Sequence, residues 1–162
     1  MEITYRDYFS YHPESPSFLI CKKRIGRKMK GEFPPVAMHP SGYLVISIQA
    51  RKFQLHRFIW EITNGKIPNG FCIDHIDGDK TNNRIENLRL ATLSQNSWNR
   101  KKQNNGDPSY PKGICVFKPG VFRAHIQRNG RRWQKYSKDI SELIAWLDSK
   151  RAELHGSYAN YG

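Results

Sequence analysis

Residues 74–89 read Asp-His-Ile-Asp-Gly-Asp-Lys-Thr-Asn-Asn-Arg-Ile-Glu-Asn-Leu-Arg, and residues 92–99 read Thr-Leu-Ser-Gln-Asn-Ser-Trp-Asn. Together they predict a strand, a polar turn, a second strand and a helix. The start of the helix is indicated by Thr92 and Gln95, which have the spacing of a capping box. The pattern gathers one carboxylate, one histidine and two asparagines, namely Asp74, His75, Asn87 and Asn96. Such side chains can hold one hard metal ion and deprotonate one water molecule.

Asp74 and His75 are adjacent in the sequence, so we expect them to have different roles. Neighbouring residues on a strand point to opposite faces, so they cannot easily bind one metal side by side. We therefore expect Asp74 to hold one divalent ion, magnesium with manganese as a substitute, and Asn96 to give a second, neutral oxygen ligand. His75 then serves as the general base towards water. Asn87 is expected to fix the tautomer and tilt of the imidazole.

The polar loop after His75 also has other interpretations. We interpret most of its polar residues as turn formers: Asp77, Gly78, Asp79, Asn82 and Asn83. A calcium-binding loop starting at Asp77 would need glycine where Asn82 stands and glutamate where Leu88 stands, so it is excluded. His56 and Asn99 are candidates for supporting the site. For His56 a core or capping role is the alternative.

The charge of the chain points to a polyanionic partner. The 162 residues carry a net charge of +13, from 27 Lys and Arg against 14 Asp and Glu. We expect double-stranded DNA rather than a membrane, because no apolar run approaches the roughly 18 residues of a spanning helix. With a metal and a general base, this charge predicts phosphodiester hydrolysis.

The cysteines and the N-terminus bear on the compartment. Three widely spaced cysteines, Cys21, Cys72 and Cys115, are interpreted as reduced and mostly buried thiols. Residues 1–6 lack the pattern of a signal peptide. We expect a cytoplasmic protein, in the cytoplasm of a host cell if a phage encodes it, and a monomer, with a dimer as the alternative.

The chain divides by pattern into four segments, and the predicted class is α+β. Residues 1–54 are expected to form a small antiparallel β region, and residues 55–102 a ββα core that begins with a helix at 55–62 and ends with one from 92 to about 100. Residues 103–112 are rich in Asn, Gly and Pro and predict a linker. Residues 113–162 predict three antiparallel strands and one helix. The linker predicts that a chain truncated after Lys102 keeps a folded metal site.

Two basic surfaces are candidates for gripping DNA. In the N-terminal segment six cations fall within nine residues, and we assign the DNA contact there to Lys22, Lys23, Arg24, Arg27 and Lys28. In the C-terminal segment the strand at 121–128 alternates, with apolar residues expected to face the helix. Its polar residues and the following arginines are expected to face DNA: Arg123, His125, Gln127, Arg131 and Arg132. A solvated hairpin and a stabilising basic appendage are the alternatives.

Residues 56–99 resemble the HNH endonucleases, close to the freestanding and intron-encoded phage type. The likeness rests on His-Arg-x-x-Trp at 56–60, Asp-His-Ile-Asp-Gly at 74–78, Asn-Asn-Arg-x-x-Asn-Leu-Arg at 82–89 and Gln-Asn-x-x-Asn at 95–99. The resemblance implies a ββα-metal core. It makes His75 the first signature residue and general base, Asn87 the second, Asn96 the third, and Asp74 the metal-binding carboxylate.

The C-terminal segment resembles the DNA-binding domain of plant ethylene-response-type transcription factors. Gly113-Ile114, Phe122-x-Ala124-x-Ile126, Asn129-Gly130 and the stretch 154–160 carry this likeness, whereas the family's Leu-Gly-x-Phe after the third strand is replaced by residues 135–138. The two resemblances imply a homing-type DNA endonuclease that nicks or cuts duplex DNA at a long site. The alternative is a catalytically silent DNA-binding regulator or architectural protein.

Overall fold

The computed structural model describes residues 5–24, 26–48, 50–99 and 109–159. The chain forms two compact units, residues 1–93 and residues 94–162, called here the N-terminal and C-terminal units. Both combine antiparallel sheets with helices, which confirms the predicted α+β class. Among the described helices, none has the length and apolar character that crossing a membrane requires.

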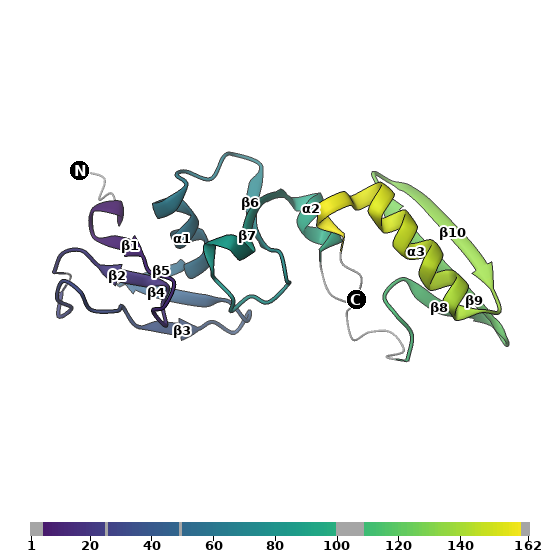
Figure 1. Ribbon diagram of the computed structural model, residues 1–162, viewed down its shortest axis with the longest axis horizontal. Coiled ribbons are helices and arrows are strands. Elements are labelled where there is room, and N and C mark those ends of the chain that lie inside the picture. Colours follow the sequence, from purple (N-terminus) through teal and green to yellow (C-terminus); the bar gives the residue numbers. More distant parts are fainter. Residues whose placement is uncertain (1–4, 25, 49, 100–108, 160–162) are drawn as a thin grey trace. The chain divides into compact units, whose positions relative to one another are not determined.

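The described residues of the N-terminal unit form three small antiparallel sheets and the helix α1 (Figure 1). The first sheet pairs β1 (Phe9–Tyr11) with β2 (Leu19–Cys21). The second has the order β3 (Val36–Met38), β4 (Leu44–Ile48), β5 (Arg51–Gln54). The third pairs β6 (Phe71–His75) with β7 (Leu88–Thr92). Helix α1 spans Leu55–Thr63, and short 3₁₀ turns cover Tyr5–Asp7 and Ile85–Asn87.

Helix α1 forms where the apolar spacing predicts it. Its buried face includes Leu55, Phe58 and Ile59, which recur at three- and four-residue steps. The helix ends at Thr63 with Asn64 as its C-cap, and Gly65 follows with a φ of +102°, a conformation that favours glycine.

One hydrophobic core joins the β region to α1 and the β6–β7 ribbon. Side chains on both sides of residue 54 are buried together in it: Phe9, Leu19, Cys21, Ile46, Ile48, Leu55, Phe58, Ile59, Ile67, Ile73 and Leu88. Residues 1–54 and the first part of the ββα motif are therefore continuous in packing.

In the described part of the C-terminal unit, residues 109–159 form a sheet covered by a helix (Figure 1). The sheet runs β8 (Ile114–Lys118), β9 (Val121–Arg128), β10 (Arg131–Ser137), with β9 in the middle. Helix α3 (Ile140–His155) packs on it, and a 3₁₀ turn follows at Gly156–Tyr158. Ala124 and Ile126 of β9 are buried against Leu143, Leu147 and Leu154 of α3, as the alternating pattern predicted.

Local signals set the ends of these elements. Asn129 and Gly130 both have positive φ, 49° and 78°, which is the two-residue hairpin turn that Asn-Gly favours. The Asp139 carboxylate accepts the backbone N–H of Ser141 at 2.8 Å and caps α3. The last helix of the ββα motif, α2, spans Leu93–Trp98, and the boundary between the units falls after its first residue. Its predicted end near Arg100 and most of the predicted linker lie outside the described residues.

Candidate functional site

The β6–β7 ribbon positions Asp74 and His75 at the end of a buried strand. In its register Asp74 lies opposite Arg89 and His75 opposite Leu88. Asp74 is 4% exposed and His75 5% exposed. The two side chains have different neighbours, as alternation along a strand requires.

Asp74 is held by an arginine across the ribbon. Nε of Arg89 donates to Oδ2 of Asp74 at 2.8 Å, and Nη2 of Arg89 forms an ion pair with the same oxygen at 2.8 Å. This contact places a positive charge next to the carboxylate. A metal ion on Asp74 would therefore share the carboxylate with Arg89.

The His75 imidazole is held by Asn83, a residue that the sequence pattern assigned to a turn. Nε2 of His75 lies 3.2 Å from Oδ1 of Asn83, and Nδ2 of Asn83 donates to the Thr81 carbonyl at 2.9 Å. An amide oxygen can only accept, so Nε2 carries the ring proton and Nδ1 is the basic nitrogen. Asn83 is fully buried, which makes this orientation rigid.

Asn87 does not make the predicted contact with the imidazole. Its Oδ1 accepts the backbone N–H of Asp77 at 3.1 Å, and its Nδ2 donates to Asp77 Oδ1 at 2.9 Å and to the Asn82 carbonyl at 2.8 Å. The side chain thus ties the polar loop closed. Because the Asn87 amide is used by these three contacts within the loop, Asn87 can influence His75 only indirectly, through the shape of the loop.

Two aromatic rings, those of His56 and Tyr43, lie near His75. The ring of His56, from α1, lies 5.0 Å from that of His75, and Tyr43 lies 4.9 Å from His56 and 6.1 Å from His75. Burial, followed by the charge of His75, lowers the pKa of His56 to about 3. Burial also lowers the pKa of His75, against the opposing hydrogen bond to Asn83 and the nearby Asp77 and Asp74 carboxylates. Both histidines are therefore neutral near pH 7, and a neutral His75 can accept a proton.

The oxygen donors suit a hard metal ion. Asp74 offers a carboxylate and Asn96, on α2, an amide oxygen. Within the described ranges, no three His, Cys, Asp or Glu side chains gather as a metal-binding group. One carboxylate and one amide, with water in the remaining positions, fit magnesium chemistry. Asp74 and Asn96 lie in different units. Asn99, the other candidate on this segment, donates its backbone N–H to the Gln95 carbonyl at 3.3 Å, which extends the hydrogen bonding of α2.

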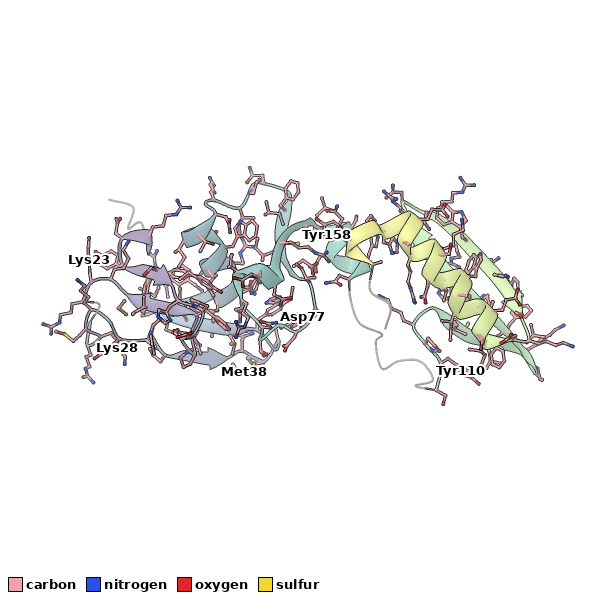
Figure 2. All side chains as sticks on the ribbon, in the orientation of Figure 1. Lys23, Lys28, Met38, Asp77, Tyr110 and Tyr158 are labelled. Carbon is pink, nitrogen blue, oxygen red and sulfur yellow. The ribbon has the colours of Figure 1, made fainter. Side chains whose placement is uncertain are left out.

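The N-terminal basic cluster lies in the exposed loop after β2. Its five assigned residues are exposed: Lys22, Lys23, Arg24, Arg27 and Lys28. Figure 2 shows the labelled Lys23 and Lys28 at the end of the N-terminal unit remote from Asp77. This cluster and the His75 loop therefore lie at opposite ends of the same unit.

In the C-terminal unit, four assigned residues share the sheet face away from α3: Arg123, His125, Gln127 and Arg132. Nη2 of Arg123 lies 3.5 Å from the Cys115 sulfur, while Arg123 Nε and His125 Nδ1 are buried and have no hydrogen-bond partner among the residues that the structure describes. Exposed Phe117 and Tyr136 lie edge to face at 4.8 Å.

Arg131 does not lie on that face. Its guanidinium carbon lies 5.2 Å from the Trp133 ring, on the side that α3 covers. Arg131 and Arg132, which the sequence placed together on the outward face, therefore lie on opposite faces, because consecutive strand residues alternate. A DNA contact by either arginine stays a prediction.

The chain is similar to viral and phage proteins. A family model described as HNH endonuclease matches residues 53–98. Protein 3.8 of Escherichia phage T7 is 39% identical over 107 residues, 65% of this chain and 88% of that protein. Uncharacterized HNH endonuclease L560 of Acanthamoeba polyphaga mimivirus is 39% identical over 121 residues, 74% of this chain and 62% of that protein. YosQ of Bacillus subtilis, an SPbeta prophage-derived protein provisionally assigned as an HNH homing endonuclease, is 27% identical over 84 residues. The match covers 52% of this chain and 49% of that protein. No solved structure matches.

Proposed function

Because this chain belongs to the HNH endonuclease family, we propose that it is a metal-dependent endonuclease that hydrolyses phosphodiester bonds of double-stranded DNA. The observation that carries the proposal is the buried His75 imidazole, whose Nε2 is held by Asn83 and which adjoins Asp74 on β6. A neutral, oriented imidazole beside a carboxylate is the arrangement that a general base needs.

His75 takes a proton from the attacking water at Nδ1, since Nε2 is engaged by Asn83. Asp74 and Asn96 are proposed to hold one magnesium ion, with manganese as a substitute. When bound, the ion supplies positive charge that stabilises the phosphorane and the leaving 3′ oxygen. Asn87 acts indirectly: its hydrogen bonds to Asp77 and to the Asn82 carbonyl hold the loop that carries Asn83.

The substrate is proposed to be a long duplex site, as for a homing enzyme. The prophage relative's provisional assignment supports this class. The basic loop after β2 and the sheet face of the C-terminal unit, which resembles the ethylene-response-type DNA-binding domain, are both proposed to bind the duplex. One His75 per chain implies nicking by a monomer, or a double-strand cut by a dimer, in the cytoplasm of an infected cell.

A plasmid relaxation assay tests the function. Supercoiled DNA carrying the chain's own genomic insertion region should be nicked in magnesium, and a chelator should stop the reaction. DNA binding without cleavage in any divalent metal would favour the alternative, a silent DNA-binding regulator.

The contact between Asn83 and His75 gives a sharper test. Asn83→Ala should slow cleavage by about 10- to 100-fold, the scale of losing a residue that orients a reacting histidine. Asn83→Asp keeps an acceptor for Nε2 and should lose less. Asn82→Ala is the matched control, because Asn82 is the adjacent asparagine and its side chain bonds Asp77 instead. Equal rates for Asn83→Ala and Asn82→Ala, measured by single-turnover kinetics, would contradict the role of Asn83.

Arg132 and Arg131 form a matched pair on opposite faces of β10. Arg132→Ala should weaken binding to all duplexes and reduce the salt slope of log K by about one, as for a lost phosphate contact. Arg123→Ala should relax preference at one base pair by roughly 1–3 kcal/mol, because Arg123 lies in the middle of the central strand. Arg131→Ala should change neither property much.

The affinity of each variant for specific and random duplexes, measured at several salt concentrations, gives both the salt slope and the base preference. An Arg131→Ala effect as large as that of Arg132→Ala would show that the face away from α3 is not the DNA-binding surface.

A further inference from the structure

Helix α2, which carries Asn96, is attached to the C-terminal unit by its last residue, Trp98. The Trp98 indole lies parallel to the His155 imidazole at the end of α3, with centroids 4.6 Å apart and 6° between the planes. The guanidinium carbon of Arg128, from the end of β9, lies 5.3 Å from the same indole. Figure 1 shows α2 beside the C-terminal end of α3.

A lysine secures the same end of the helix through the backbone. Nζ of Lys112 donates to the carbonyl of Trp98 at 3.1 Å. Carbonyls in the last turn of a helix lack partners within it and carry partial negative charge, so a cation stabilises this end. Lys112 is itself held, because Arg151 of α3 donates to its carbonyl and forms an ion pair with Asp148 at 3.0 Å. Arg151 is 5% exposed, so this support is part of the packed interior.

The length of α2 makes these contacts necessary. The helix has six residues, whereas isolated helices shorter than roughly 12–15 residues are marginal in water. Trp98 follows Asn96 by two residues, about 200° around a helix, so the two side chains leave from nearly opposite faces. One face can therefore attach to the C-terminal unit while the other presents Asn96.

We propose that Trp98 is a positioning residue of the nuclease: through its stack on His155, with the support of Lys112, the C-terminal unit fixes α2 and thereby Asn96. The inference rests on the proposed function, because it takes Asn96 as a metal ligand. It makes the sheet-and-helix unit part of the catalytic apparatus as well as a DNA-binding module. His155 Nε2 also lies 3.4 Å from the Gln127 carbonyl, so the stack is joined to the end of β9.

The test uses the full chain with Trp98→Ala, Trp98→Phe and His155→Ala. Two quantities are measured: Mn²⁺ binding, from the electron paramagnetic resonance of the free ion, and the metal concentration that gives half-maximal cleavage. Trp98→Ala should raise both the Mn²⁺ dissociation constant and the half-maximal concentration by about 10-fold or more, the scale of losing a residue that orients a metal ligand. Trp98→Phe keeps an aromatic ring on His155 and should recover most of the loss. The double variant Trp98→Ala/His155→Ala should lose little beyond Trp98→Ala, because the two residues act as one contact.

Trp133→Ala is the matched control. It removes another half-buried tryptophan of the same unit, also with an arginine over its ring, but one that packs on the sheet core rather than on α2. It should lower the melting temperature and leave the metal dependence unchanged. A folded Trp98→Ala that binds Mn²⁺ and cleaves as the wild type does would overturn the positioning role alone. A wild-type chain that neither binds Mn²⁺ nor cleaves would overturn the proposed function, and this inference with it.

Discussion

Replacing His75 with alanine should lower the rate of DNA cleavage by about 100-fold or more, the scale of losing a general base. Burial lowers the pKa of His75, so its imidazole is neutral near pH 7 and can accept a proton, and Asn83 Oδ1 lies 3.2 Å from its Nε2. DNA affinity should stay close to that of the wild type. Single-turnover cleavage and a mobility-shift assay measure the two effects separately.

Loss of packing must be distinguished from loss of the base. His75 is buried beside His56, so His75→Gln, which fills more of the space but is no base near pH 7, should be as slow as His75→Ala. His39→Ala, at an exposed histidine of the same unit, serves as the control and should cleave normally. A His75→Gln variant that cleaves at the wild-type rate would show that another group takes the proton.

Removing either proposed metal ligand should abolish cleavage, because an ion with two protein ligands cannot spare one. Asn96→Ala should be partly rescued by raised magnesium or manganese before Asp74→Ala is, since the carboxylate supplies charge as well as an oxygen. Cleavage rates over a metal titration check the order of rescue. The reverse order would contradict the assigned ligand roles.

The Asp74 variant needs a stability control. Asp74→Ala leaves Arg89 without its carboxylate, and breaking a buried ion pair costs about 3–5 kcal/mol. Asp74→Asn keeps an oxygen for Arg89 and should preserve more of the melting temperature while still losing cleavage. If Asp74→Asn cleaves as the wild type does, the charge of this residue is not required.

The sequence predicted elements with local signals and missed contacts that depend on the path of a loop. The Asn129-Gly130 turn and the apolar spacing of α1 are signals that lie within a few residues of sequence. The hairpin turn and the helix both form where these signals predict them. Asn83 carried no such signal, because its contact with His75 spans a loop whose shape is set by Asn87 and Asp77. The assignment of Asn87 to the imidazole failed for the same reason.

Register and long-range packing explain the other differences. Arg89 meets Asp74 only because β6 and β7 pair in one register, which the sequence alone does not specify. A truncation after Lys102 removes Lys112 and His155, which contact Trp98, so whether the shortened chain keeps the metal site stays a prediction. A linker-like composition at 103–112 gives no information about contacts that bridge it. The catalytic and metal-binding roles themselves stay predictions.

The core of the N-terminal unit limits how such a gene can recombine. A breakpoint at residue 54 would separate Phe9, Leu19 and Ile46 from Leu55 and Phe58, and each fragment would expose the apolar surface that the other now covers. Fragments of that kind tend to aggregate rather than combine with new neighbours. The smallest cassette that can move between genomes with its fold intact therefore extends from the first hairpin through β7, and hybrid nucleases built from shorter inserts should be insoluble.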